Sequence, residues 1–161
     1  FRFFTVYGPW GRPDMAPFKF TKAILNGEPI DIYNYGLMSR DFTYIDDLVD
    51  GMRLLINVIP RVEDTPNSNE GANDSKSSVA PFRVINIGNS KPTQLLDFVQ
   101  AFEKSLGVKV LKNLMEMQAG DVPATWADTS LLEGLTGFKP STDHHTGVQN
   151  FVRWYRDYYD V

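Results

Sequence analysis

The chain contains no cysteine and only two histidines among its 161 residues. A disulfide framework and a thiolate metal site are therefore excluded, and a cysteine-free composition is in keeping with a reducing compartment. The histidines, His144 and His145, are neighbours in sequence, and we expect neighbouring side chains to point apart. With no further cluster of ligating residues they do not indicate a metal site. The composition predicts a cytoplasmic protein that holds no metal.

The chain also lacks the sequence features of a dinucleotide-binding enzyme. Its 12 glycines include no G-x-G-x-x-G or G-x-x-G-x-x-G spacing, so no loop for dinucleotide phosphates is encoded. None of its 7 tyrosines is followed four positions later by a lysine, the spacing of the acid/base pair in short-chain dehydrogenases. We therefore predict that this chain contributes no catalytic residue and no cofactor-binding residue.

Long apolar runs and a strong charge imbalance are absent as well. No apolar run approaches the length that a bilayer requires. The formal net charge of -4 does not favour nucleic acid or an acidic membrane surface as a partner. With 42% hydrophobic and 22% charged residues, the composition is that of an ordinary globular protein. We expect neither nucleic acid nor a membrane among its partners.

Segments with strand-like and helix-like patterns alternate along the chain, which is typical of an α/β protein. Predicted strands cover residues 1–7, 30–35, 40–45, 82–87 and 108–114. Predicted helices begin near 17, 46, 93 and 130, and a last helix covers residues 148–159. Asp46 or Asp47, Thr93 and Ser130 have side chains suited to cap three of these helices. Residues 60–81 are polar and nearly free of large apolar groups, and their length predicts a mobile loop.

Two arginines occupy positions suited to binding an anion. Arg12 lies in a turn-rich loop between Gly11 and Pro13, and Arg40 opens a predicted strand. An arginine fixed near a strand end can donate two hydrogen bonds to a phosphate, each contributing about 1.5–3 kcal/mol. A salt bridge to a nearby acid such as Asp41 or Asp46 is the alternative, and both readings stay open at this point.

Four ordered blocks resemble UDP-glucuronate 4-epimerases, which are extended short-chain dehydrogenase/reductases of the NAD-dependent epimerase/dehydratase group. The blocks are RFFTVYGPWGRPDMA at 2–16, RDFTYIDD at 40–47, FRVINIGNS at 82–90 and GDVPATWAD at 120–128. A tyrosine-glycine-proline run alone is common to the extended family, whereas its continuation to Met15 is narrower. The resemblance covers the whole chain and is least specific in the polar loop.

The resemblance implies an α/β architecture for the C-terminal part of such an enzyme. Residues 1–7 and the helix after Asp46 would be the last Rossmann-type strand and helix, followed by a small α/β substrate-binding domain. Residues 1–161 would then be the nucleotide-sugar-binding portion, and the N-terminal NAD-binding Rossmann domain would lie outside this chain. The chain opens on a strand-like run without a methionine or leader, in keeping with that expectation.

The resemblance also assigns substrate contacts to individual positions. Thr5 would lie near the uronate carboxylate, Arg12 would reach the charged part of the substrate, and Arg40 would clamp the diphosphate. Asp31 and Tyr33 would lie beside the uracil, and Asp121 would approach the ribose or the diphosphate. Related sugar epimerases carry a second arginine at the position of Gln118, so Arg12 is the candidate to replace it.

The function implied for the complete protein is the interconversion of UDP-glucuronate and UDP-galacturonate at C4, with NAD as its cofactor, while this chain alone is inactive. A nucleotide-sugar dehydratase or uronate decarboxylase of the same family is an alternative, which the run from Gly11 to Met15 argues against. A second alternative is a non-catalytic sugar-nucleotide binding module. The expected partner is a UDP-sugar, in a homo-oligomer.

Overall fold

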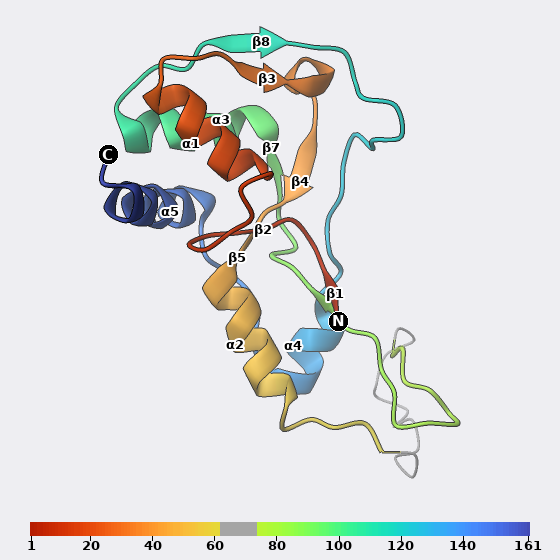
Figure 1. The fold of residues 1–161 in the computed structure, drawn as a ribbon. Coiled ribbons are helices and arrows are strands. Elements are labelled where there is room, and N and C mark those ends of the chain that lie inside the picture. The colour runs from red at the N-terminus through yellow and green to blue at the C-terminus, as the bar shows by residue number, and fades with distance from the viewer. Residues whose placement is uncertain (62–73) are drawn as a thin grey trace.

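Helices and short strands alternate along residues 1–61 and 74–161, which the computed structural model describes (Figure 1). The helices are α1 (Ala16–Leu25), α2 (Ile45–Leu55), α3 (Leu95–Leu106), α4 (Ser130–Thr136) and α5 (His144–Tyr159), with a 3-10 helix η1 (Tyr33–Gly36). The strands are β1 (Arg2–Phe3), β2 (Val6–Tyr7), β3 (Ile30–Ile32), β4 (Ser39–Asp41), β5 (Thr43–Tyr44), β6 (Asn86–Ile87), β7 (Pro92–Gln94) and β8 (Lys112–Leu114). The predicted α/β class is confirmed.

The strands form separate pairs that join segments far apart in sequence. The pairs β1–β6, β2–β5 and β3–β8 are parallel, and β4–β7 is antiparallel. Parallel partners require a long connection between them, so each pair brings a late segment beside an early one. In β3–β8, Asp31 stands opposite Asn113, and in β4–β7, Arg40 stands opposite Thr93.

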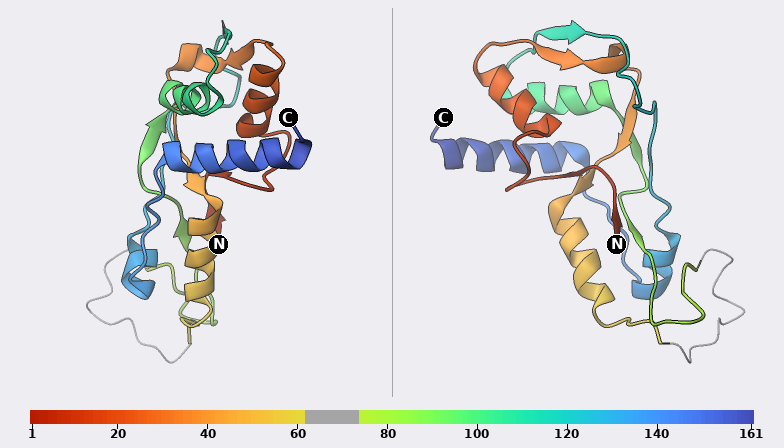
Figure 2. Two further views of the ribbon diagram at one scale, coloured as in Figure 1. Left: turned by 90° about the vertical axis from the view of Figure 1, so that its left-hand side faces the viewer. Right: turned by 45° about the vertical axis from the view of Figure 1, so that its right-hand side comes forward.

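Two apolar clusters divide the molecule into an upper body and a lower limb (Figures 1 and 2). In the upper body, α1, α3 and α5 pack together, and the rings of Phe42 and Phe98 stack 3.7 Å apart at its centre. In the lower limb, α2 packs on α4 through a smaller cluster that includes Leu48, Ile87 and Leu132. The larger cluster therefore fixes the elements around the pocket described below.

Three helix starts differ from the predictions based on capping residues. Helix α2 begins at Ile45 without a side-chain cap, and α3 begins at Leu95, so Thr93 belongs to β7. Ser130 is the first residue of α4, whose capping position is Thr129. Asp47 has a tertiary partner instead, because its carboxylate accepts from the amide of Thr142 at 2.8 Å. Among these predicted caps, the side chain of Asp47 thus serves a contact between distant segments.

The strands are shorter than predicted. The predicted strand 1–7 is interrupted between β1 and β2, and strand 30–35 ends at Ile32. The reason for the second break is conformational, since Asn34 and Tyr35 take φ values of 49° and 52°, outside the extended region. Of the predicted loop 60–81, residues 62–73 lie outside the described residues, and 74–81 form neither helix nor strand.

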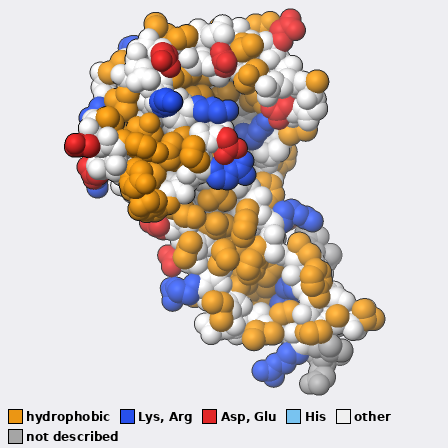
Figure 3. Space-filling view, in the orientation of Figure 1, with side chains coloured by type: hydrophobic (Ala, Val, Ile, Leu, Met, Phe, Trp, Pro, Cys, Tyr) orange, Lys and Arg blue, Asp and Glu red, His pale blue; other side chains and the backbone are white. Residues whose placement is uncertain are grey.

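Apolar side chains gather on the surface of the lower limb (Figure 3). Phe1, Phe3, Val49 and Ile56 are exposed, with Ile56 at 70%. Exposed apolar side chains gathered in this way usually mark a packing or association surface. Within the described residues, no helix combines the length and apolar character needed to cross a membrane.

Candidate functional site

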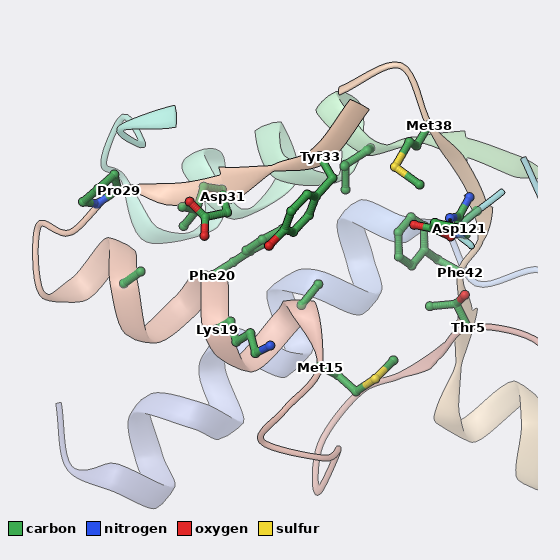
Figure 4. Close-up of a pocket in the computed structure, with 15 residues that line it drawn as sticks. Thr5, Met15, Lys19, Phe20, Pro29, Asp31, Tyr33, Met38, Phe42 and Asp121 are labelled. Carbon is green, nitrogen blue, oxygen red and sulfur yellow. Dashed lines mark hydrogen bonds and ion pairs between the residues drawn. The ribbon is translucent and has the colours of Figure 1, made fainter. Parts of the chain in front are cut away.

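A pocket of about 490 Å³ lies between α1, the β3–η1 segment and β4 (Figure 4). Its volume falls within the range of about 300–1,000 Å³ that is typical of small-ligand sites. Apolar side chains form most of the wall, and a few charged or hydroxyl groups interrupt it. The lining residues are Thr5, Met15, Ala16, Lys19, Phe20, Ala23, Pro29, Ile30, Asp31, Tyr33, Met38, Arg40, Phe42, Leu95 and Asp121.

The pocket brings together five of the six residues singled out from the sequence. Those five are Thr5, Asp31, Tyr33, Arg40 and Asp121. The sixth, Arg12, is not among the lining residues. Its side chain is 73% exposed and forms an ion pair with Asp14, whose side-chain hydrogen bond raises the pKa of the Arg12 guanidinium. Of the two roles considered for Arg12, anion binding or a salt bridge, the structure therefore shows the salt bridge.

Arg40 is anchored from two sides at the edge of the pocket. Its Nη2 donates to Asp121 Oδ1 at 2.7 Å, and its Nη1 donates to the Ser39 carbonyl at 2.9 Å. The acid that pairs with Arg40 is thus Asp121, rather than the predicted Asp41 or Asp46. The guanidinium carries five N–H donors, and the described residues provide no partner for those not used in these two bonds, so Arg40 retains donors for an anion.

Asp41, the next residue, fixes the strand that carries Arg40. Its fully buried carboxylate accepts from the backbone amides of Asn89, Ser90 and Ala127 at 2.7, 2.9 and 2.9 Å. Three backbone donors satisfy a buried carboxylate well, whereas an unpaired one would be very costly. A single side chain therefore joins β4 to the two segments that follow β6 and precede α4.

Asp31 and Tyr33 line the pocket on the side away from Asp121, the acid that pairs with Arg40 (Figure 4). Asp31 Oδ1 accepts from Asn113 Nδ2 at 2.8 Å, which ties β3 to β8 through side chains as well as backbone. Tyr33 opens η1, just before the left-handed residues that turn the chain toward β4. The turn therefore brings Tyr33 and Arg40 into one concave surface.

Lys19 is a pocket residue that the sequence reasoning missed. It lies on α1 in a stripe with Ala16, Phe20 and Ala23, at the spacing of one helix face. This spacing was visible in the sequence, but a lysine on an exposed helix position reads as a solvated side chain. Only the packing of α1 beside β3 shows that this face borders a cavity.

Thr5 reaches the pocket from the break between β1 and β2. Its carbonyl accepts from the Thr43 amide at 2.9 Å, which fixes its backbone beside β5. Its hydroxyl has no hydrogen-bond partner among the described residues. The interruption of the predicted strand is therefore what presents a free hydroxyl to the cavity.

The side chains of the two histidines do not point apart as predicted. The rings of His144 and His145 lie 4.2 Å apart rather than diverging. Burial lowers the pKa of His144, as does the neighbouring His145, against the opposing effect of Asp143 and Asp97. Among residues 1–61 and 74–161, no group of three or more His, Cys, Asp or Glu side chains could hold a metal ion.

Comparisons with known proteins identify relatives of this chain. Residues 1–67 match the model of the NAD dependent epimerase/dehydratase family. A probable UDP-glucuronate 4-epimerase of Rhizobium meliloti is 56% identical over 159 residues, covering 99% of this chain and 46% of the relative. UDP-glucuronate 4-epimerase 4 of Arabidopsis thaliana is 49% identical over 162 residues, covering 98% of this chain and 36% of the relative.

A solved structure has the same fold over nearly the whole chain. It is the UDP-glucuronic acid 4-epimerase of Bacillus cereus in complex with UDP-glucuronic acid and NAD, with a TM-score of 0.77 and 32% identity. The match covers 98% of this chain and 45% of that chain. The chain thus spans less than half the length of the relatives it matches. Over nearly its whole length the chain is thus similar to part of the UDP-glucuronate 4-epimerases, and its first 67 residues match the NAD-dependent epimerase/dehydratase family.

Proposed function

We propose that this chain supplies the nucleotide-sugar pocket of an NAD-dependent enzyme that interconverts UDP-glucuronate and UDP-galacturonate at C4. The observation that carries the proposal is the convergence of Thr5, Asp31, Tyr33, Arg40 and Asp121 on one cavity of ligand size. They come from four separate segments of the sequence, since Asp31 and Tyr33 share the β3–η1 segment. The relatives named above, one of which holds UDP-glucuronic acid and NAD, support the same assignment.

The chemistry of the wall suits the parts of a UDP-sugar. Arg40 has free N–H donors for the diphosphate, and such charge-assisted bonds are strong and directional. Tyr33 offers an aromatic ring, and Asp31 an acceptor, at the side assigned to the uracil. The free hydroxyl of Thr5 can donate to the uronate carboxylate. Asp121 can accept from a ribose hydroxyl, as its position beside Arg40 allows.

NAD is the proposed cofactor of the complete protein, and it supplies the transient oxidation at C4 when bound. The residues of this chain do not fit an NAD site, since the glycine spacing that cradles dinucleotide phosphates is missing from the sequence. This chain is therefore assigned the binding and orientation of the substrate. No proton or hydride transfer is derived from its residues.

Product analysis of the complete protein with UDP-glucuronate and NAD tests the proposal. We expect UDP-galacturonate and an equilibrium reached from either sugar. Carbon dioxide and a UDP-pentose would indicate a decarboxylase, and loss of water from UDP-glucose would indicate a dehydratase. Binding of UDP-sugars without turnover would favour the non-catalytic module. For the isolated chain we expect neither bound NAD nor epimerisation.

Compartment and assembly belong to the same proposal. We infer a cytoplasmic homo-oligomer, supported by the cysteine-free composition and by the apolar surface around Val49 and Ile56. Sedimentation over a range of concentrations tests the second part. A monomer at every concentration would contradict it.

A further inference from the structure

We propose that Lys19 is a second cationic contact for the diphosphate of the bound nucleotide sugar, acting together with Arg40. The inference rests on the proposed function and names a binding residue that the sequence comparison with the family did not assign. It is carried by the position of Lys19 in the pocket, by the charges that surround it, and by the lack of an ion-pair partner for it within residues 1–61 and 74–161.

The position of Lys19 follows from the way α1 packs. Ala16, Phe20 and Ala23 line the cavity from the same helix, so Lys19 belongs to the stripe that faces it. Figure 4 shows the Lys19 side chain extending from α1 toward the space beneath Tyr33. The side chain is exposed at the rim, which leaves its ammonium group hydrated and free to move. A flexible four-carbon stem lets the ammonium reach a ligand in the cavity.

The charges in the wall explain why a second cation is needed. Four charged side chains line the pocket: Lys19, Arg40, Asp31 and Asp121. They sum to zero, and the positive charge of Arg40 is already paired with Asp121 at 2.7 Å. A diphosphate brings two negative charges, so Arg40 alone leaves the site with an excess of negative charge. Lys19 has no hydrogen-bond or ion-pair partner among the residues that the structure describes, and it therefore offers an uncommitted positive charge.

The other candidates for this role are placed unfavourably. Arg12 is paired with Asp14 outside the pocket lining, and Gln118 is neutral and also outside the lining. The hydrogen bond from Arg12 is the main cause of the lowered pKa of Asp14, and the charge of Lys19 adds only a smaller effect. The structure therefore favours Lys19 over Arg12 as the residue that completes the anion site.

Binding of UDP, UMP and uridine to the complete protein tests the assignment without any turnover. We compare wild type with Lys19→Met, which removes the charge, and Lys19→Arg, which keeps it. Lys22→Met is the matched control, because Lys22 is exposed on the same helix but does not line the pocket. Titration calorimetry at two salt concentrations gives each affinity.

The expected result is a loss of about tenfold in UDP affinity for Lys19→Met, a smaller loss for UMP, and no change for uridine. The salt dependence of UDP binding should also become shallower, since one charge contact is removed. The UDP affinity of Lys19→Arg should stay within about threefold of that of wild type. Lys22→Met should bind UDP as tightly as wild type.

Several outcomes would overturn the assignment. Unchanged UDP affinity in Lys19→Met, or an equal loss for uridine and UDP, would show that Lys19 does not contact the phosphates. In both cases wild-type UDP binding leaves the proposed function intact. Failure of the wild-type protein to bind UDP at all would instead reject the proposed function, and this inference with it.

Discussion

The guanidinium of Arg40 donates to the carboxylate of Asp121 at 2.7 Å, although the two residues are 81 positions apart. The pair closes one end of the pocket and joins β4 to the loop that follows β8. Both side chains are partly shielded, with 18% exposure for Arg40 and 34% for Asp121. Asp121 orients the side chain of Arg40. It also competes with an anionic ligand for the positive charge of the guanidinium.

Replacement of Arg40 by alanine should weaken UDP, UDP-glucose and UDP-glucuronate by the same factor. The diphosphate is common to all three, and loss of a hydrogen bond to a charged group costs about 1.5–3 kcal/mol, or roughly 10- to 150-fold. Titration calorimetry with each ligand measures the effect. Asp121→Asn is the complementary variant, which removes the competing charge and should raise the affinity for UDP relative to uridine by a few-fold. Undiminished UDP binding in Arg40→Ala would contradict the clamp.

Replacement of Thr5 by valine should affect the uronate selectively. Valine keeps the branched shape but deletes the hydroxyl, so one carboxylate oxygen loses its donor. We expect UDP-glucuronate to lose about fivefold or more in affinity, while UDP-glucose, whose neutral hydroxymethyl can turn to another partner, changes less. Thr5→Ser retains the hydroxyl and serves as the control. If both sugars weaken equally in Thr5→Val, the Thr5 hydroxyl does not recognise the uronate carboxylate.

Replacement of Asp41 by asparagine should destabilise the fold. The side chain is fully buried and accepts three backbone amide hydrogens, and an amide nitrogen would face donors instead. We expect a loss of about 2–4 kcal/mol in the free energy of unfolding. Asp50→Asn is the control, because Asp50 is half exposed and its pair with Arg53 lies on the surface. Urea unfolding of both variants measures the difference, and equal stabilities would refute a structural role for the Asp41 carboxylate.

Glu103 should make stability depend on pH in the acid range. Burial by itself raises the pKa of this carboxyl, but hydrogen bonds from Lys112, the Val110 amide and Lys109 together lower it, to about 2 from 4.5. Because the folded-state pKa is below the unfolded one, the contribution of Glu103 is fully present above pH 4.5 and is lost as the pH falls toward about 2. The contribution is roughly 1–2 kcal/mol, since the lysine partners are partly exposed and screened.

Urea unfolding of wild type and Glu103→Gln across that pH range tests the contribution of Glu103. The stability of wild type should fall more steeply with acid than that of the variant, and the two curves should converge near pH 2. Glu28 is exposed and follows α1, so Glu28→Gln should leave the dependence of the unfolding free energy on pH unchanged. Parallel curves for wild type and Glu103→Gln would show that Glu103 has the same pKa folded and unfolded.

The sequence by itself determined the α/β class, the helices and, through the family resemblance, five of the fifteen residues that line the pocket. Helix periodicity and the glycine at position 107, which takes a left-handed φ of 72° at the end of α3, are local properties and were readable. The blocks that contain Thr5, Arg40 and Asp121 were also readable, because they resemble blocks of UDP-glucuronate 4-epimerases. The lack of a glycine-rich dinucleotide-binding loop could be read directly from the spacing of the glycines.

Only the tertiary structure decided which partners those residues have. The sequence places Asp41 and Asp46 beside Arg40, yet Asp121 forms the pair, because β4 runs against the segment around Pro123 and Ala124. Lys19 is an ordinary surface lysine until α1 packs beside β3 and turns its stripe toward a cavity. Contacts of this kind depend on chain segments separated by tens of residues, and local propensity carries no record of which distant segments will meet.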